Sequence, residues 1–204
     1  MTTATSMLNR LILIIDDSPA ICEDFRKILQ SNARASSLRT ARATLFEDTP
    51  VDDAPEGFAV DCADQGQAGL AMVQSALQRG CPYAVAFVDM LMPPGWDGLE
   101  TIEHLWSVDP ELEIVICTAF ADLVRDRFPQ RLEHSDKLLI LRKPFDNIEV
   151  WQLASVLTRK WYLTQQVKRQ LTSLTAPAEQ RTQELPGVSA PLQDEMTQGQ
   201  ADTK

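Results

Sequence analysis

The sequence has little of what most metal, redox and nucleic-acid sites are built from. Its 204 residues include two histidines and four cysteines, and no two cysteines are spaced as CxxC. Neither His104 nor His134 has a ligand-like spacing, so no zinc site is predicted. Lysine and arginine number 19 against 29 acids, which gives a formal net charge of −10. Such a chain is a poor non-specific nucleic-acid binder, because phosphate contacts need clustered basic side chains.

Long apolar runs and export signals are also missing. No run approaches the about 20 residues that a membrane span needs. The first ten residues, MTTATSMLNR, contain no apolar core of signal-peptide length. Cys22 and Cys117 lie in apolar segments and are predicted to be small core residues, and no disulfide framework is predicted. We therefore expect a cytoplasmic protein in a reducing compartment, with neither membrane nor nucleic acid as a partner.

Apolar runs of strand length alternate with segments of helical periodicity. Residues 11–15 are a continuous, mostly β-branched apolar run, which is typical of a strand covered on both faces. Four further strands are predicted at 58–62, 85–88, 113–119 and 138–141. Helices are predicted at 19–31, 65–79, 99–109 and 122–131, and from 147 onward. Short connections between such units indicate an α/β fold with a doubly wound parallel sheet.

Residues 32–56 do not fit this alternation. They begin polar and basic, and then become acidic with two prolines. The segment is long for a connection in a compact domain. We interpret it as a surface insertion, which is either mobile or carries extra structure.

Four predicted strands end on side chains that carry chemistry: Asp16 and Asp17, then Asp89, Thr118 and Lys143. The carboxyl ends of parallel strands share one edge, where open α/β sheets bind ligands. Crowded carboxylates repel one another and need a counter-charge, which a hard cation such as Mg²⁺ supplies. One acid could then attack phosphorus and form an aspartyl-phosphate, while the lysine neutralises developing charge and the threonine donates a hydrogen bond.

These motifs resemble the receiver domain of two-component response regulators, the CheY-like superfamily. The matching segments are Asp16-Asp17, Asp89-Met-Leu-Met-Pro, Asp97-Gly98-Leu99-Glu100, Thr118-Ala119 and Lys143-Pro144-Phe145. The resemblance spans roughly residues 10–163. It implies a flavodoxin-like (βα)5 fold with a five-stranded parallel sheet in the order 2-1-3-4-5. In this chain the last helix is expected to be extended.

The resemblance implies roles for four residues around a Mg²⁺ ion. Asp89 would be the phosphoacceptor and also a metal ligand. Asp17 would ligate Mg²⁺ directly, and Asp16 mainly through water. The backbone carbonyl of Leu91 would complete the protein ligands.

The resemblance also implies a switch. Lys143 would pair with Asp89 or its phosphate, Thr118 would move toward the phosphate, and the Lys143–Pro144 peptide bond would be cis. The family's switch aromatic is replaced by Ile140, so the usual aromatic rotamer change is missing. The loop at residues 92–98 is one residue longer than the family pattern, and its Trp96 could be an interaction residue or a local lid.

Three regions are predicted: an N-terminal tail (1–9), the receiver (10–163), and a helical extension with a disordered tail (164–204). An interrupted heptad stripe follows residue 147. It fits either a helix packed to about Trp161 with an exposed extension that pairs with a partner or second copy, or a last helix that then frays. From about Thr175 the composition favours disorder.

We therefore predict a phosphoryl-accepting receiver in a two-component phosphorelay. A histidine kinase or phosphotransfer protein would be the donor, and a downstream signalling protein the target. No DNA-binding output domain is recognisable, and the chain is not expected to be an enzyme. The alternative is a receiver-fold dimerisation or scaffold module that phosphorylation does not regulate. An aspartyl-phosphate hydrolase fits less well, since Leu91 stands where such enzymes place a second acid. A homodimer is left open.

Overall fold

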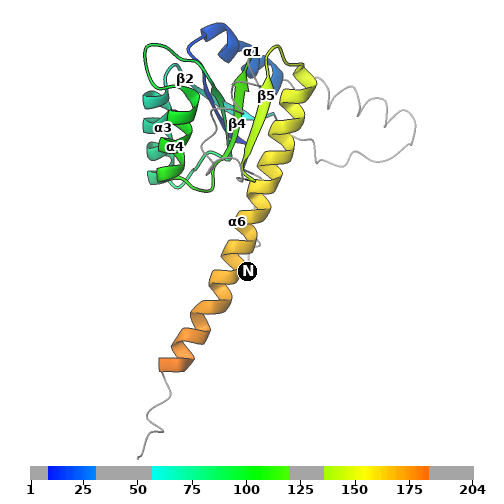
Figure 1. Cartoon of the computed structure of the whole chain (residues 1–204). Coiled ribbons are helices and arrows are strands. Elements are labelled where there is room, and N and C mark those ends of the chain that lie inside the picture. Colours follow the sequence, from blue (N-terminus) through cyan, green and yellow to red (C-terminus); the bar gives the residue numbers. More distant parts are fainter. Residues whose placement is uncertain (1–8, 31–56, 120–135, 184–204) are drawn as a thin grey trace, which may run out of the picture. The chain divides into compact units, whose positions relative to one another are not determined.

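The computed structural model of the protein describes residues 9–30, 57–119 and 136–183, with side chains described as far as residue 173 (Figure 1). The strands are β1 (Leu11–Ile15), β2 (Ala59–Ala63), β3 (Val85–Asp89), β4 (Glu113–Thr118) and β5 (Leu138–Arg142). The helices are α1 (Pro19–Gln30), α3 (Gly66–Gln78), α4 (Gly98–Val108) and α6 (Asn147–Gln183).

The five strands form one sheet in the order β2-β1-β3-β4-β5, and every neighbouring pair is parallel. The predicted fold class and strand order are therefore confirmed. Each predicted strand lies within one residue of its observed bounds, because a continuous apolar run marks a strand buried on both faces. The predicted helix at 122–131 and the insertion at 32–56 lie outside the described residues.

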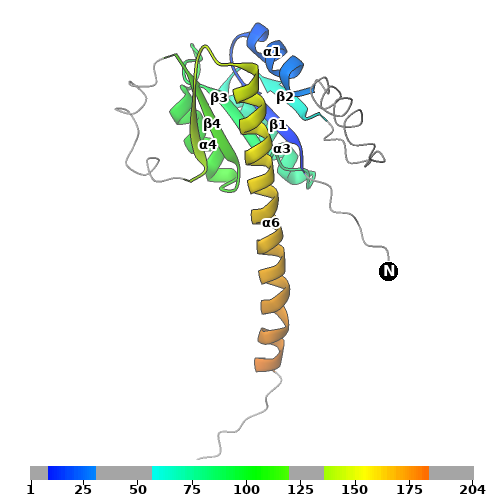
Figure 2. The same cartoon turned by 90° about the vertical axis from the view of Figure 1, so that its right-hand side faces the viewer.

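The central strand β1 shows how the two layers of the core are built. Ile12 and Ile14 face one cluster, together with Phe25 of α1 and Val150 of α6. Leu13 and Ile15 belong to a second cluster, to which α3 and α4 contribute. Figures 1 and 2 show α3 and α4 on one side of the sheet, with α1 and the first turns of α6 on the other. Both faces of β1 are thus covered, which is why its sequence does not alternate.

Helix α6 begins as a core helix and continues beyond it. Val150, Ala154, Leu157 and Trp161 are buried at helical spacing, as a stripe that packs on a sheet requires. The chain divides into two compact units, and the boundary between them follows Thr164. Within the described residues, no helix is long and apolar enough to cross a bilayer.

The helix ends at Gln183, later than the composition predicts. Disorder was expected from about Thr175, and residues 175–183 are helical instead. Extending an existing helix requires no new nucleation, and the alanine, glutamine, glutamate and arginine of this segment favour a helix, although its Pro177 does not. Residues 184–204 lie outside the described part.

A disulfide joins α1 to β2, and this corrects the cysteine prediction. Cys22 and Cys62 are bonded, with their Cα atoms 6.3 Å apart. The two are 40 residues apart in sequence, so their proximity arises only when α1 packs beside β2. Cys117 is a buried free thiol, as predicted, and Cys81 is free and exposed. Burial raises the pKa of the Cys117 thiol well above its usual range.

Candidate functional site

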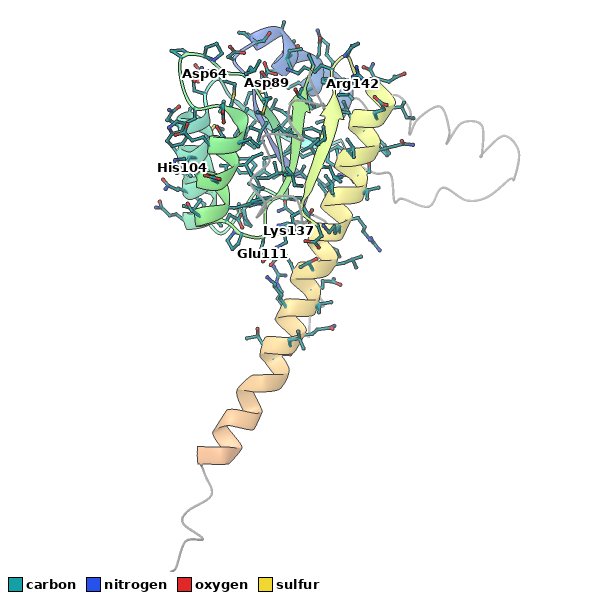
Figure 3. All side chains as sticks on the ribbon, in the orientation of Figure 1. Asp64, Asp89, His104, Glu111, Lys137 and Arg142 are labelled. Atoms are coloured by element: carbon teal, nitrogen blue, oxygen red, sulfur yellow. A yellow bond between two sulfur atoms is a disulfide. The ribbon has the colours of Figure 1, made fainter. Side chains whose placement is uncertain are left out.

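Strand register brings the predicted acids together at the carboxyl edge of the sheet. In β1 and β3, Ile15 is level with Val88, so Asp16 and Asp89 follow at corresponding positions of adjacent strands. Figure 3 shows Asp89 at the same edge as Arg142, the last residue of β5, and far from Glu111 and Lys137 at the opposite edge.

Three carboxylates gather at this edge. Asp16, Asp17 and Asp89 each offer an oxygen, and these oxygens lie within 4.8 Å of one another. The Asp16 and Asp89 side chains are 4% and 12% exposed, whereas Asp17 is exposed. Several carboxylate oxygens around one point, with one side open to water, are the donor set that Mg²⁺ prefers.

Lys143 bridges two of the acids. Its Nζ donates hydrogen bonds to Asp16 Oδ2 at 2.8 Å and to Asp89 Oδ1 at 2.7 Å. Its backbone N–H donates to the Thr118 carbonyl at 2.7 Å, and the following peptide bond to Pro144 is cis, as predicted. The single positive charge of Lys143 does not balance three carboxylates, so the cluster fits a divalent cation in addition to the lysine.

Burial and nearby charges determine the protonation of Asp89 and Lys143. Burial raises the pKa of Asp89, the hydrogen bond from Lys143 opposes that rise, and the nearby Asp16 carboxylate adds to it. Burial alone would lower the pKa of Lys143, but its hydrogen bonds to the two aspartates outweigh burial and raise it. Lys143 therefore keeps its positive charge at neutral pH.

Asp16 is also held by the turn that follows β1. Its Oδ1 accepts a hydrogen bond from the Ser18 N–H at 2.9 Å. Its own N–H donates to the Ala63 carbonyl of β2 at 3.1 Å. Both carboxylate oxygens of Asp16 thus already have protein donors, while Asp17 is the exposed acid of the pair.

The remaining predicted residues occupy different surroundings. Thr118 ends β4 and is buried. The Leu91 N–H donates to the Asp89 carboxylate, and Leu91 as a whole is 54% exposed. Ile140 is level with Ile116 in the β4–β5 pair, two residues before Thr118, and it is 42% exposed. The structure therefore brings Asp16, Asp17, Asp89 and Lys143 into one cluster and leaves Ile140 outside it.

The longer loop after Asp89 is fixed to α4. Asp97 caps this helix, because its Oδ1 accepts from the Glu100 N–H at 2.9 Å. The Trp96 ring stacks on His104, with centroids 4.0 Å apart and planes 19° from parallel. Trp96 therefore packs against α4 in this structure.

The sequence did not show why position 98, next to the acid cluster, is occupied by glycine. A Cβ at this position would lie 2.6 Å from the Asp89 carbonyl oxygen and 2.9 Å from the Met90 Cα. The Gly98 N–H also donates to the Met90 carbonyl at 2.9 Å. Helix α4 thus starts directly against the backbone of Asp89, and only glycine fits there.

We expect Gly98→Ala to disturb both the fold and the site. The new methyl group meets backbone atoms, which cannot rotate away, so the free energy of unfolding should fall by about 2 kcal/mol. Gly95→Ala is the matched control, because its Cβ would meet chiefly the end of the flexible Gln65 side chain. Urea denaturation of both variants checks this. Equal stability of the two would contradict the proposed backbone clash.

Comparisons with solved structures bear on the fold. An adenylate cyclase structure from Rhodopirellula baltica is 22% identical, with 81% of this chain and 98% of that chain covered and a TM-score of 0.54. A response regulator receiver domain protein from Clostridium thermocellum is 18% identical (76% and 98% covered, TM-score 0.53). The signal receiver domain of an HD domain-containing protein from Pseudomonas fluorescens Pf-5 is 14% identical (81% and 98%, TM-score 0.56).

These likenesses show that the chain has the receiver fold, which confirms the predicted resemblance at that level. No protein-family model matches the chain, and no curated protein matches it significantly.

Proposed function

We propose that this chain, with its receiver fold, accepts a phosphoryl group on Asp89 in a two-component phosphorelay. The observation that carries the proposal is the cluster of Asp16, Asp17 and Asp89 at the carboxyl edge of the sheet, in which Lys143 Nζ donates to Asp16 and Asp89. The Mg²⁺ that these acids fit would, when bound, neutralise charge on the incoming phosphoryl group. Asp17, Asp89 and the Leu91 carbonyl would hold it directly, and Asp16 mainly through water.

The chain's own residues supply the transfer chemistry in this proposal. An Asp89 carboxylate oxygen attacks phosphorus, a bond from oxygen to phosphorus forms, and the bond from phosphorus to the donor breaks. The donor keeps the electron pair of that bond. Lys143 then pairs with the phosphoryl oxygens, and the Thr118 hydroxyl donates to one of them.

Phosphorylation would change the charge of this edge and thereby signal. A phosphoryl group adds about 1.5 to 2 negative charges at neutral pH. Redirecting Lys143 and Thr118 toward it would bias the surface around β4 and β5. Because residue 140 is isoleucine, this position of the surface has no aromatic side chain that could reorient. The response would therefore be transmitted by Thr118 and by the backbone of β4, the strand that Thr118 ends.

The proposed partners follow from this chemistry and from the charge. A histidine kinase or phosphotransfer protein would donate, and a downstream signalling protein would read the phosphorylated surface. The net charge of −10 argues against nucleic acid as a partner. We place the chain in the cytoplasm and assign it no enzymatic activity on a separate substrate. The alternative role, a dimerisation or scaffold module, requires no phosphoryl transfer.

Intact mass after incubation with acetyl phosphate and Mg²⁺ tests the proposal. We expect one added phosphoryl group, which is absent in Asp89→Ala and in a chelated sample. A panel of histidine kinases serves as a second donor set, since a small donor is not the natural one. If neither donor set phosphorylates the chain and Mg²⁺ does not bind, the phosphoryl-acceptor function is wrong and the scaffold role is favoured.

A further inference from the structure

The Cys22–Cys62 disulfide lies beside the acid cluster. Cys62 is level with Ile14 in the β1–β2 pair, two residues before Asp16. Cys22 lies in the first turn of α1, directly after the turn that carries Asp16 and Asp17. The disulfide thus connects α1, which follows this acid pair, to β2, which pairs with the strand that precedes it.

Hydrogen bonds close a ring through the disulfide and Asp16. Asp16 Oδ1 accepts from the Ser18 N–H at 2.9 Å, and the Ser18 carbonyl accepts from the Cys22 N–H at 3.3 Å. The disulfide then leads from Cys22 to Cys62. The next carbonyl, that of Ala63, accepts from the Asp16 N–H at 3.1 Å. Opening the sulfur–sulfur bond removes the covalent cross-link from this ring and leaves the start of α1 held to β2 by non-covalent contacts alone.

The disulfide lies at an edge of the sheet. Cys22 is 7% exposed, but Cys62 is only partly buried and lies on β2, an edge strand of the sheet. In a reducing compartment, protein disulfides are usually transient and serve redox sensing or catalysis. A disulfide beside the acid cluster therefore points to regulation of that cluster.

We propose that Cys22 and Cys62 form a redox modification site, and that their disulfide raises the affinity of the Asp16, Asp17 and Asp89 cluster for a divalent cation. This inference rests on the proposed function of the cluster. Oxidation is an exchange with a small-molecule disulfide such as glutathione disulfide. One sulfur–sulfur bond forms in the protein and one breaks in the reagent, and both electrons and both thiol protons end on the two glutathione sulfurs.

The physical basis is preorganisation. When the turn is tied to both α1 and β2, its two acids are held near their binding positions before the cation arrives, so less ordering opposes binding. We expect the oxidised chain to bind Mg²⁺ about five- to tenfold more tightly than the reduced chain, which is the low end of typical coupling between sites. Linkage requires the converse as well, so saturating Mg²⁺ must shift the glutathione equilibrium toward the disulfide by the same factor.

Calorimetric titration of the full chain with Mg²⁺ tests this, after oxidation with glutathione disulfide or reduction with a phosphine. Intact mass distinguishes the two forms, because the disulfide form has two hydrogens fewer than the reduced form. Cys22→Ser/Cys62→Ser should bind like the reduced chain whatever the reagent, whereas Cys81→Ser should behave as wild type. Equal dissociation constants for the two forms would overturn the proposal. So would loss of secondary structure on reduction, seen by far-ultraviolet circular dichroism, because the disulfide would then be purely structural.

The same samples separate this inference from the proposed function. If both forms bind Mg²⁺ equally and accept a phosphoryl group equally, the redox site is wrong and the phosphoryl-acceptor function stands. If neither form binds Mg²⁺ or accepts a phosphoryl group, both proposals are overturned.

Discussion

Lys143→Met should abolish efficient phosphoryl transfer and destabilise the fold at neutral pH without divalent cations. Lys143 is the positive charge that contacts both Asp16 and Asp89, at 2.8 and 2.7 Å. Methionine keeps much of the side-chain volume but leaves two largely buried carboxylates facing each other. Removing one partner of such a pair costs about 3 kcal/mol. Loss of the charge that faces the phosphoryl group should lower the transfer rate about 100- to 1,000-fold.

The pH dependence of this variant follows from the direction of the Asp89 pKa. Burial already holds that pKa above its ordinary value, and Lys143 opposes the rise, so the variant's Asp89 titrates at still higher pH. A carboxyl whose folded pKa exceeds its unfolded value stabilises the fold at low pH, and this contribution is lost as pH rises through the folded pKa. The deficit of Lys143→Met should therefore be largest at neutral pH and shrink as pH falls, or when Mg²⁺ is added.

Urea denaturation at pH 7 and pH 5, with and without Mg²⁺, measures the stability effect, and phosphoryl incorporation measures the rate. Lys27→Met is the control, because Lys27 pairs with Asp24 in a mostly exposed salt bridge of little expected energy. If Lys143→Met were as stable as Lys27→Met at pH 7, the lysine would not be balancing the acids.

Loss of the Cys22–Cys62 disulfide should lower the free energy of unfolding by about 4 kcal/mol, the chain-entropy value for a loop of this length. The bond joins residues 40 apart, so in the unfolded chain it removes much conformational freedom. Urea denaturation with and without a phosphine reductant checks the effect in wild type. Cys22→Ser/Cys62→Ser should match the reduced wild type, and Cys81→Ser should keep full reductant sensitivity. A midpoint that reductant does not move would show that the disulfide does not stabilise the fold.

Local sequence signals were enough for the five strands and for the identity of the acids, whereas the strand order was expected from the resemblance. The apolar run at residues 11–15 and its four counterparts predict buried parallel strands, and this arrangement is observed. Asp16 and Asp89 were recognisable because each directly follows or ends such a run. The cis bond before Pro144 is observed as well, although it was expected from the resemblance and not from the residues alone.

The sequence by itself determined which residues form strands and which chemistry stands at the strand ends, because these depend on neighbours a few positions away. Only the tertiary structure decided which distant groups touch. Lys143 reaches Asp16 across 127 positions of sequence, and Cys22 bonds to Cys62 although the cysteine spacing gave no sign of it. Gly98 is required because α4 begins against the backbone of Asp89. Each of these contacts depends on how whole elements pack, and no local pattern of residue types encodes that packing.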